Sequence, residues 1–411
     1  MTIERSPHFS RRTAWPSESN RWSELRRLCE IEGRPLVDLT LSNPTRVGLP
    51  PVDDLSRGAL ADPRGWIYEP VARGSAEARA AIAAEVSGEL SGPVSGPVSG
   101  RVSGDDFVLC ASTSEAYGWL FKLLCERGDQ VLVPRPSYPL LEFLAELEEV
   151  ELVSYPLVYE GGWSVDLDAL SSLVGPRTRA IIAIHPNNPT GHLVGPGDAA
   201  GLQELATTHG LSVISDEVFL DYLWRADSPA ERPRGSLAEG SPPALTFALD
   251  GLSKSAGLPQ LKLGWIRVSG PQPSKREALR RLDFIADTYL SVNAPVQVAL
   301  PRILAHRHVT AEALRERCRS NLALLDRAVS RDALITRLVG DGGWSAVLRV
   351  PATRSDETWA LELMDLAGVV VHPGEFYGFD QGAHLVLSLI GESNQFEEGI
   401  ARLVGHVLAR S

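Results

Sequence analysis

Short apolar runs alternate with amphipathic stretches through the middle of the chain. Several of these runs are apolar at consecutive positions, as expected of strands that helices cover on both faces. The amphipathic stretches between them predict helices, so the pattern indicates an α/β fold with a mostly parallel seven-stranded sheet. The predicted strands are Phe107–Cys110, Gln130–Pro134, Glu151–Tyr155, Ala180–His185, Ser212–Ser215, Leu245–Leu249 and Gly264–Val268.

The pattern changes beyond Leu290. A long helical stretch at Pro295–Val329 precedes two strand-like runs, Ser345–Val350 and His384–Leu389, and a final helix from Asn394. We expect residues 46–290 to form a large domain, and residues 1–45 together with 291–411 to form a smaller α+β domain. Within the large domain, residues 87–104 read SGELSGPVSGPVSGRVSG, which predicts a flexible insertion without chemistry.

Composition narrows the possible functions. The 411 residues carry 40 Lys and Arg against 52 Asp and Glu, and the net charge of -12 disfavours binding to nucleic acid. No apolar run approaches the ~18 residues of a membrane span, and the N-terminus lacks a signal-like apolar segment, so we expect a cytoplasmic protein. The four cysteines lack CxxC spacing, which argues against disulfides and against a metal site.

Four short motifs each follow a predicted strand. GLSKSAGLPQLKLGW at 251–265 places Lys254 among small residues, where partial desolvation lowers a lysine pKa and favours the neutral amine that forms imines. IIAIHPNNPTG at 181–191 ends a strand in a tight turn, from which an asparagine side chain can donate a hydrogen bond into a crevice. Alternatively, Lys254 is a solvated surface lysine, and the segment around Asn188 is simply a turn.

The other two motifs supply a carboxylate and a phosphate cradle. LSVISDEVFLDY at 211–222 places Asp216 at the end of a strand too apolar for an unpaired carboxylate, so a cation such as a protonated pyridine nitrogen is expected nearby. LCASTSEAYGWLFKLL at 109–124 passes from strand to helix through Ser112, Thr113 and Ser114, whose hydroxyls and free N–H groups suit a phosphate. Helix capping is the alternative for both motifs.

In this order, the four motifs make the chain similar to fold-type I enzymes that use pyridoxal 5'-phosphate (PLP), specifically to the class I/II aminotransferase family. The similarity extends from DLTLSNP at 38–44 through YEPVARGSAEARAAIA at 68–83 to HPGEFYGF at 372–379. It implies a large PLP-binding domain, a small domain and a homodimer with shared active sites. It also implies a small-molecule amino donor and a 2-oxo acid acceptor as reaction partners.

The resemblance assigns roles residue by residue. Lys254 matches the lysine that holds PLP as a Schiff base and moves protons, and Asp216 matches the carboxylate that pairs with the pyridinium nitrogen. Asn188 matches the donor to the phenolic oxygen of PLP. Tyr138, in PRPSYPLLEF, matches the aromatic residue that stacks on the ring, although its flanking prolines also fit a turn aromatic.

The phosphate of PLP has its own set of matches. Ser112, Thr113 and Ser114 match the cradle at the helix N-terminus, and Tyr68 matches a tyrosine that the partner subunit contributes. Lys262 stands where the family usually has an arginine, and it supplies charge without the bidentate fork. Gly251 replaces the usual serine, for which Ser253 is an uncertain substitute.

Two departures concern the ring and the substrate. Phe219 replaces a tyrosine that usually donates to the phenolic oxygen, and Val386 replaces the arginine that usually grips the substrate α-carboxylate. Either another cation binds that carboxylate, or the substrate has none in that place. Ser42 borders the expected substrate position. Arg46 is our first candidate for a relocated cation, or else a surface arginine, and the weaker candidates are Arg73, Arg349 and His384.

The resemblance favours transamination between an amino acid or amine and a 2-oxo acid. The alternative is a PLP-dependent lyase acting at a Cβ–S or similar bond, because the same carbanion can expel a leaving group. A non-enzymatic PLP-binding regulator is disfavoured, because too few residues precede Leu36 to form a DNA-binding helix-turn-helix domain.

Overall fold

The structure is a computed structural model that describes residues 8–15, 19–49, 54–88, 102–224, 235–330 and 334–411. Residues 89–101, which make up most of the predicted flexible insertion, lie outside the described residues. Within the described ranges, no helix is both long enough and apolar enough to cross a membrane.

The seven apolar runs are all strands of one sheet, which has the order β2-β9-β8-β7-β6-β3-β4-β5. Strands β8, β7, β6, β3 and β4 are parallel neighbours, whereas β9 runs antiparallel to β8 and β2. The eighth strand, β5, was not predicted, because it has only three residues and pairs with β4 as a short hairpin. The bounds are β2 Phe107–Cys110, β3 Gln130–Arg135, β4 Glu151–Tyr159, β5 Trp163–Val165, β6 Thr178–Ile184, β7 Ser212–Asp216, β8 Thr246–Gly251 and β9 Gly264–Ser269.

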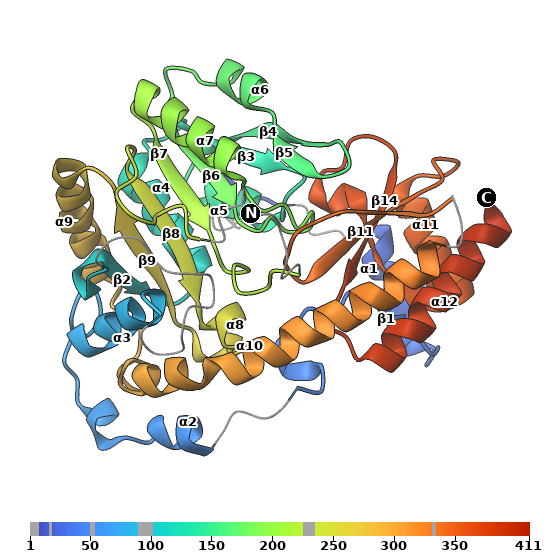
Figure 1. Cartoon of the computed structure of the whole chain (residues 1–411), viewed down its shortest axis with the longest axis horizontal. Coiled ribbons are helices and arrows are strands. Elements are labelled where there is room, and N and C mark those ends of the chain that lie inside the picture. The colour runs from blue at the N-terminus through green and yellow to red at the C-terminus, as the bar shows by residue number, and fades with distance from the viewer. Residues whose placement is uncertain (1–7, 16–18, 50–53, 89–101, 225–234, 331–333) are drawn as a thin grey trace, which may run out of the picture.

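Helices cover both faces of this sheet, which explains the unbroken apolar runs (Figure 1). On β3, Val131 packs with one hydrophobic cluster and the next residue, Leu132, packs with another. The first cluster includes residues of α4 (Thr113–Leu124), α5 (Leu140–Leu147) and α9 (Gln272–Tyr289). The second includes residues of α6 (Leu167–Ser172) and α7 (Pro196–His209).

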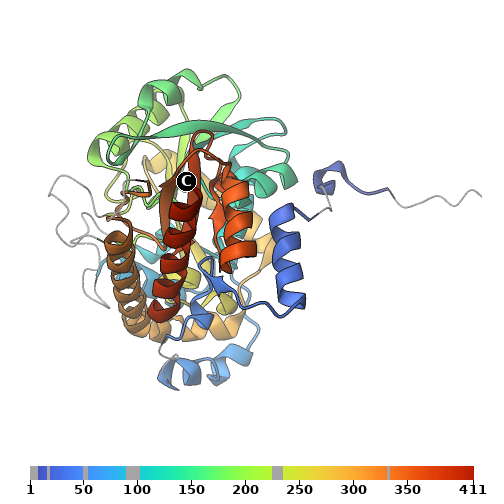
Figure 2. The ribbon, with the colours of Figure 1, turned by 90° about the vertical axis from the view of Figure 1, so that its right-hand side faces the viewer.

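A second, antiparallel sheet has the order β10-β11-β14-β13. Its strands are β10 Thr336–Leu338, β11 Ser345–Val350, β13 His372–Pro373 and β14 Ala383–Ser388. Helices α1 (Arg21–Ile31), α11 (Asp356–Glu362) and α12 (Ser393–Arg410) lie around it (Figure 2). Early and late parts of the chain meet here, because β1 (Val37–Asp38) pairs in parallel with β12 (Val369–Val370).

The long helix α10 (Ala294–Val329) connects the two sheets along one side of the molecule (Figure 1). It contacts α2 (Asp54–Ala59) and α3 (Ala76–Val86) near the large sheet, and α12 beside the small one. Arg307 of α10 pairs with Glu85 of α3 at 2.6 Å and also with Asp221, which lies a few residues after β7. Arg307 also donates a hydrogen bond to the Ser255 carbonyl oxygen of the short helix α8 (Leu252–Ser255), which directly follows β8. These buried interactions hold α10 against the end of the large sheet where α8 begins.

Candidate active site

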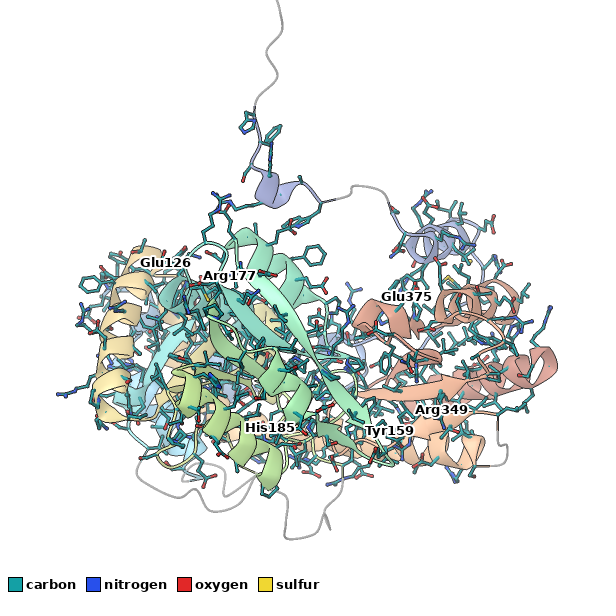
Figure 3. The ribbon with its side chains drawn as sticks, turned by 90° about the horizontal axis from the view of Figure 1, so that it is seen from above. Glu126, Tyr159, Arg177, His185, Arg349 and Glu375 are labelled. Atoms are coloured by element: carbon teal, nitrogen blue, oxygen red, sulfur yellow. The ribbon has the colours of Figure 1, made fainter. Side chains whose placement is uncertain are left out.

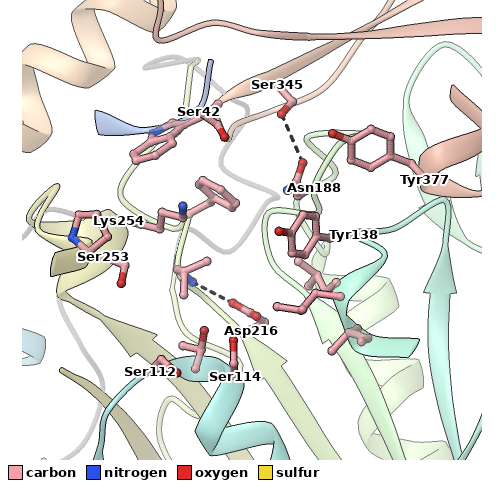
Figure 4. Close-up of a pocket in the computed structure, with 18 of the residues that line it drawn as sticks. Ser42, Ser112, Ser114, Tyr138, Asn188, Asp216, Ser253, Lys254, Ser345 and Tyr377 are labelled. Atoms are coloured by element: carbon pink, nitrogen blue, oxygen red, sulfur yellow. Dashed lines mark hydrogen bonds between the residues drawn. The ribbon is translucent and has the colours of Figure 1, made fainter. Parts of the chain in front are cut away.

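A cavity of about 430 Å³ lies where the carboxyl ends of the parallel strands face the small sheet. Ten of the twelve residues predicted to bind the cofactor or the substrate line it, so motifs far apart along the chain converge on one site. They are Ser42, Ser112, Thr113, Ser114, Tyr138, Asn188, Asp216, Ser253, Lys254 and Lys262. Figure 4 shows the Lys254 amine directed into the space between Asp216 and Asn188.

Lys254 lies on α8, directly after β8, and aromatic side chains surround it. Its Nζ atom lies 5.0 Å from the ring centre of Trp344 and 5.8 Å from that of Phe219. The Tyr222 hydroxyl donates a hydrogen bond of 2.5 Å to the Lys254 carbonyl oxygen, which fixes the backbone. Burial lowers the pKa of Lys254, and the charge of Asp216 opposes this only in part. The lysine is thus biased toward the neutral, nucleophilic amine.

Asp216 ends β7, and its carboxylate accepts two hydrogen bonds. The Tyr117 hydroxyl donates to Oδ2 at 3.0 Å, and the Val218 N–H donates to Oδ1 at 3.3 Å. Burial nevertheless raises the pKa of Asp216, because these two neutral donors do not replace the lost water. A cationic group in the cavity would relieve that penalty, and a protonated pyridine nitrogen fits this requirement.

The N-terminus of α4 forms one end of the cavity. Ser112 caps the helix, since its hydroxyl accepts from the Glu115 N–H at 3.2 Å, so capping accounts for this hydroxyl. Thr113 and Ser114 begin the helix and also line the cavity, with the positive end of the helix dipole beside them. Lys262 adds a cation to the lining. This donor set fits a phosphate group.

The structure explains why glycine stands at position 251. A Cβ atom there would lie 2.8 Å from the Cα atom of Gly264 and 2.9 Å from the carbonyl oxygen of Leu263. Strands β8 and β9 therefore approach each other too closely for the serine that the resemblance leads one to expect.

Polar side chains without charge form the opposite wall. The Ser345 hydroxyl donates to Oδ1 of Asn188 at 3.3 Å, which leaves the amide NH₂ of Asn188 as a donor (Figure 4). The Tyr377 hydroxyl lies 3.0 Å from Nδ1 of His372. Burial lowers the pKa of His372 to about 4, so this ring is neutral at neutral pH. Tyr138 also lines the cavity and remains 46% exposed.

Several predicted residues lie outside this cavity. Arg46 is exposed and does not line it. Arg73 forms an ion pair of 2.7 Å with Asp283 and donates to the Asp105 carbonyl, beside β2. Tyr68 is 81% exposed, so this chain does not bring it to its own Lys254.

Arg349 and His384 face each other across β11 and β14, and neither lines the cavity. Figure 3 shows Arg349 on the small sheet. Val386 does line the cavity, as the resemblance implied.

The model of the aminotransferase class I and II family matches residues 70–403. The chain belongs to this family. Glutamate-pyruvate aminotransferase AlaA of Haemophilus influenzae is 26% identical over 385 residues, covering 91% of each chain. An alanine aminotransferase of Mycobacterium tuberculosis (strain H37Rv) is 28% identical over 272 residues, which are 66% of this chain and 60% of the relative.

Solved structures share the fold of this aminotransferase. An alanine aminotransferase from Pyrococcus furiosus superposes with a TM-score of 0.84 at 22% identity, covering 95% of this chain and 96% of the other. A double mutant of Thermus thermophilus aspartate aminotransferase gives 0.82 at 20% identity, covering 97% of this chain and all of the other. The chain is therefore a PLP-dependent aminotransferase with the fold-type I architecture, and the lyase alternative is not favoured.

Sequence reasoning did not single out four side chains at the aminotransferase site: Tyr117, Trp344, Ser345 and Tyr377. Tyr117 could have been predicted from the sequence. It lies one helical turn after the predicted phosphate cradle, so its side chain points back toward the same strand-to-helix connection. Trp344 and Ser345 could not, since they reach the cavity only through the packing of the small sheet against the large one.

Proposed function

We propose that Lys254 holds PLP through a Schiff base and that the freed lysine moves the proton between the substrate carbon and the cofactor. The observation that carries this assignment is the position of a buried lysine, a buried carboxylate and a helix N-terminus around one cavity. Bound PLP supplies an electron sink for the carbanion that transamination requires.

The other side chains have binding and orienting roles in this proposal. Asp216, oriented by Tyr117, keeps the ring nitrogen protonated, and Asn188 donates to the phenolic oxygen. Tyr138 stacks on the ring. The first turn of α4 binds the phosphate together with Lys262 and Ser253. Phe219 donates no hydrogen bond to the phenolic oxygen, so this oxygen depends on Asn188 alone among the residues assigned here.

On the substrate side, we propose Ser42 as a contact, because it lines the cavity next to the small sheet. Arg46 remains a hypothesis from the sequence, since its side chain is exposed. The names of the relatives, glutamate-pyruvate and alanine aminotransferase, support pyruvate as the first 2-oxo acid to test.

We further propose a cytoplasmic homodimer in which Tyr68 completes the phosphate site of the partner subunit. Three consecutive large side chains support an interface here: Trp66 is 85% exposed, Ile67 62% and Tyr68 81%. Apolar groups exposed side by side are typical of surfaces that another chain covers. We keep the division into a large domain of residues 46–290 and a small domain of residues 1–45 and 291–411 as part of the proposal.

The cofactor assignment has a direct test. Purified protein should be yellow, and borohydride should bleach the absorbance band and attach the cofactor irreversibly to Lys254, as read by peptide mass spectrometry. Lys254→Ala should lack this band and the covalent product, whereas Lys275→Ala, at an ion pair with Asp106 outside the cavity, should keep both. Attachment to another lysine would overturn the assignment.

A further inference from the structure

The backbone around Lys254 depends on contacts from other segments. Helix α8 has only four residues, Leu252–Ser255, and lies between Gly251 and Gly257. A helix this short forms few hydrogen bonds of its own, so side chains from elsewhere hold it in place. The Tyr222 hydroxyl is one of these groups, and it donates to the Lys254 carbonyl oxygen at 2.5 Å.

Tyr222 also contacts an aromatic side chain that lies beside the lysine amine. Its ring centre is 5.0 Å from that of Trp344, in an edge-on contact. The same Trp344 ring has its centre 5.0 Å from Nζ of Lys254. One tyrosine therefore bonds the lysine backbone directly and, through Trp344, supports one side of the space that the amine occupies.

The tyrosine itself is held firmly by its surroundings. Tyr222 is fully buried. Its N–H donates to the Phe219 carbonyl oxygen at 2.9 Å, and its own carbonyl oxygen accepts from the Gly343 N–H at 2.9 Å. Gly343 directly precedes Trp344, so these bonds connect the turn after β7 to the residue beside the amine. The position of Tyr222 is thus passed on to both ends of the lysine.

This support matters most while the lysine is free. In the proposed function, a covalent bond to PLP holds the amine until a substrate takes its place, and the freed Lys254 then moves the proton. The freed side chain is long and flexible, so the direction of its amine depends on where the backbone starts and on the contacts around it. A displacement of about 1 Å in a reacting group can lower a rate by up to about 100-fold.

We propose that Tyr222 is a positioning residue for Lys254, which directs the freed amine during proton transfer without contacting substrate or cofactor. Tyr222 does not line the cavity, which agrees with an action through Lys254 and Trp344. The inference rests on the proposed function, because it needs Lys254 to be the residue that moves the proton.

The variant Tyr222→Phe removes only the hydroxyl and keeps the ring. The Lys254 carbonyl oxygen retains a hydrogen bond from the Gly257 N–H at 3.1 Å, so the variant should fold. Tyr155→Phe is the matched control, because the buried Tyr155 hydroxyl donates to the Ile182 carbonyl oxygen at 2.8 Å and neither residue lines the cavity. A general effect of losing a buried hydroxyl would appear in both variants.

Transamination kinetics of the holoenzyme give the first readout. With alanine as donor, the single-turnover rate constant at saturation should fall by about tenfold in Tyr222→Phe, while the half-saturating alanine concentration changes by less than about twofold. The kinetic isotope effect of alanine deuterated at Cα should be at least as large as in wild type, because proton transfer stays rate-limiting. Tyr155→Phe should match wild type throughout. An unchanged rate constant in Tyr222→Phe, or an equal loss in both variants, would overturn the proposal.

The second readout needs neither cofactor nor turnover. Acetic anhydride reacts with neutral lysine amines, so acetylation of Lys254 over a pH series, read by peptide mass spectrometry on the cofactor-free full chain, gives the pKa of this amine. Burial lowers that pKa in wild type, and the charge of Asp216 opposes the effect. In Tyr222→Phe the less confined amine gains water, so its pKa should rise toward the ordinary value, whereas Tyr155→Phe should leave it unchanged.

The two readouts separate the inference from the function on which it rests. If borohydride attaches the cofactor to a lysine other than Lys254, the proposed function fails and the inference falls with it. If the cofactor is attached to Lys254 but Tyr222→Phe leaves the pKa of this amine unchanged, the inference alone is overturned. If wild type does not accept alanine, the acetylation experiment decides the role of Tyr222.

Discussion

At the scale of single residues, Gly251 shows how a backbone contact outweighs a favourable side chain. We predict that Gly251→Ser, which restores the serine typical of the family, lowers the free energy of unfolding by about 1–3 kcal/mol through overpacking against Gly264. It should also fail to tighten PLP binding. Thermal unfolding and cofactor titration measure the two effects. Gly405→Ser is the control, since a Cβ atom at position 405 meets no atom within 4 Å. Tighter cofactor binding by Gly251→Ser would contradict this explanation.

Another residue-scale prediction concerns His185, which is fully buried before the Asn188 turn. Its Nδ1 accepts from the Val194 N–H at 3.0 Å, and its Nε2 lies 3.2 Å from the Gly235 carbonyl. Burial lowers the pKa of His185 from 6.5 to about 4. Between these values the unfolded chain binds a proton that the folded chain does not, so stability falls as the pH falls, by up to about 3 kcal/mol.

The variant His185→Gln isolates this contribution. It should destabilise the protein at about pH 7.5 through lost hydrogen bonds, and the difference from wild type should shrink at about pH 5, because glutamine does not titrate. Guanidinium unfolding at the two pH values measures the difference. An equal difference at both pH values would show that the pKa of His185 is not lowered.

At the scale of elements, one buried arginine of α10 forms ion pairs with α3 and with the segment after β7. Arg307 is 9% exposed and pairs with Glu85 and Asp221, which are 5% and 14% exposed. Arg307→Met removes the cation from this buried group, so we predict a loss of about 3 kcal/mol or more in the free energy of unfolding. Chemical denaturation checks it. Arg280→Met on α9, at an exposed pair with Glu277, should change nothing measurable.

Most strands of the large sheet could be predicted from the sequence. All seven expected strands form, because an apolar run between helices has few alternatives once both faces must be buried. The site residues that directly follow strands could be predicted, because the carboxyl ends of parallel strands lie on the same side of the sheet. Trp344 and Tyr377 were missed, since their place depends on how one sheet packs against the other. Gly251 was noticed as a departure, but its cause lies in the strand spacing, which no local pattern encodes.

At the scale of the whole molecule, the proposed sharing of sites predicts complementation between two inactive chains. Lys254→Ala and Tyr68→Ala each disable a site. If Tyr68 serves the partner, a hybrid dimer of the two variants contains one site with both residues intact and one with neither. Co-expression with different affinity tags should restore about half of the wild-type activity per dimer. Ultracentrifugation gives the oligomeric state, and a hybrid without activity would show that Tyr68 serves the Lys254 of its own chain and not that of the partner.

The pairing of early with late chain segments has a consequence for biosynthesis. Val37 pairs with Val369, more than 300 residues later, and Ser388 bonds the carbonyl oxygens of Leu39 and Leu41 at 2.7 Å and 2.6 Å. The segment that carries Thr40 and Ser42 thus finds its lasting neighbours only after the ribosome has made β12 and β14. The cofactor end of the pocket, built from residues 112 to 264, can take shape earlier, and the wall that meets the substrate is the last part to be assembled.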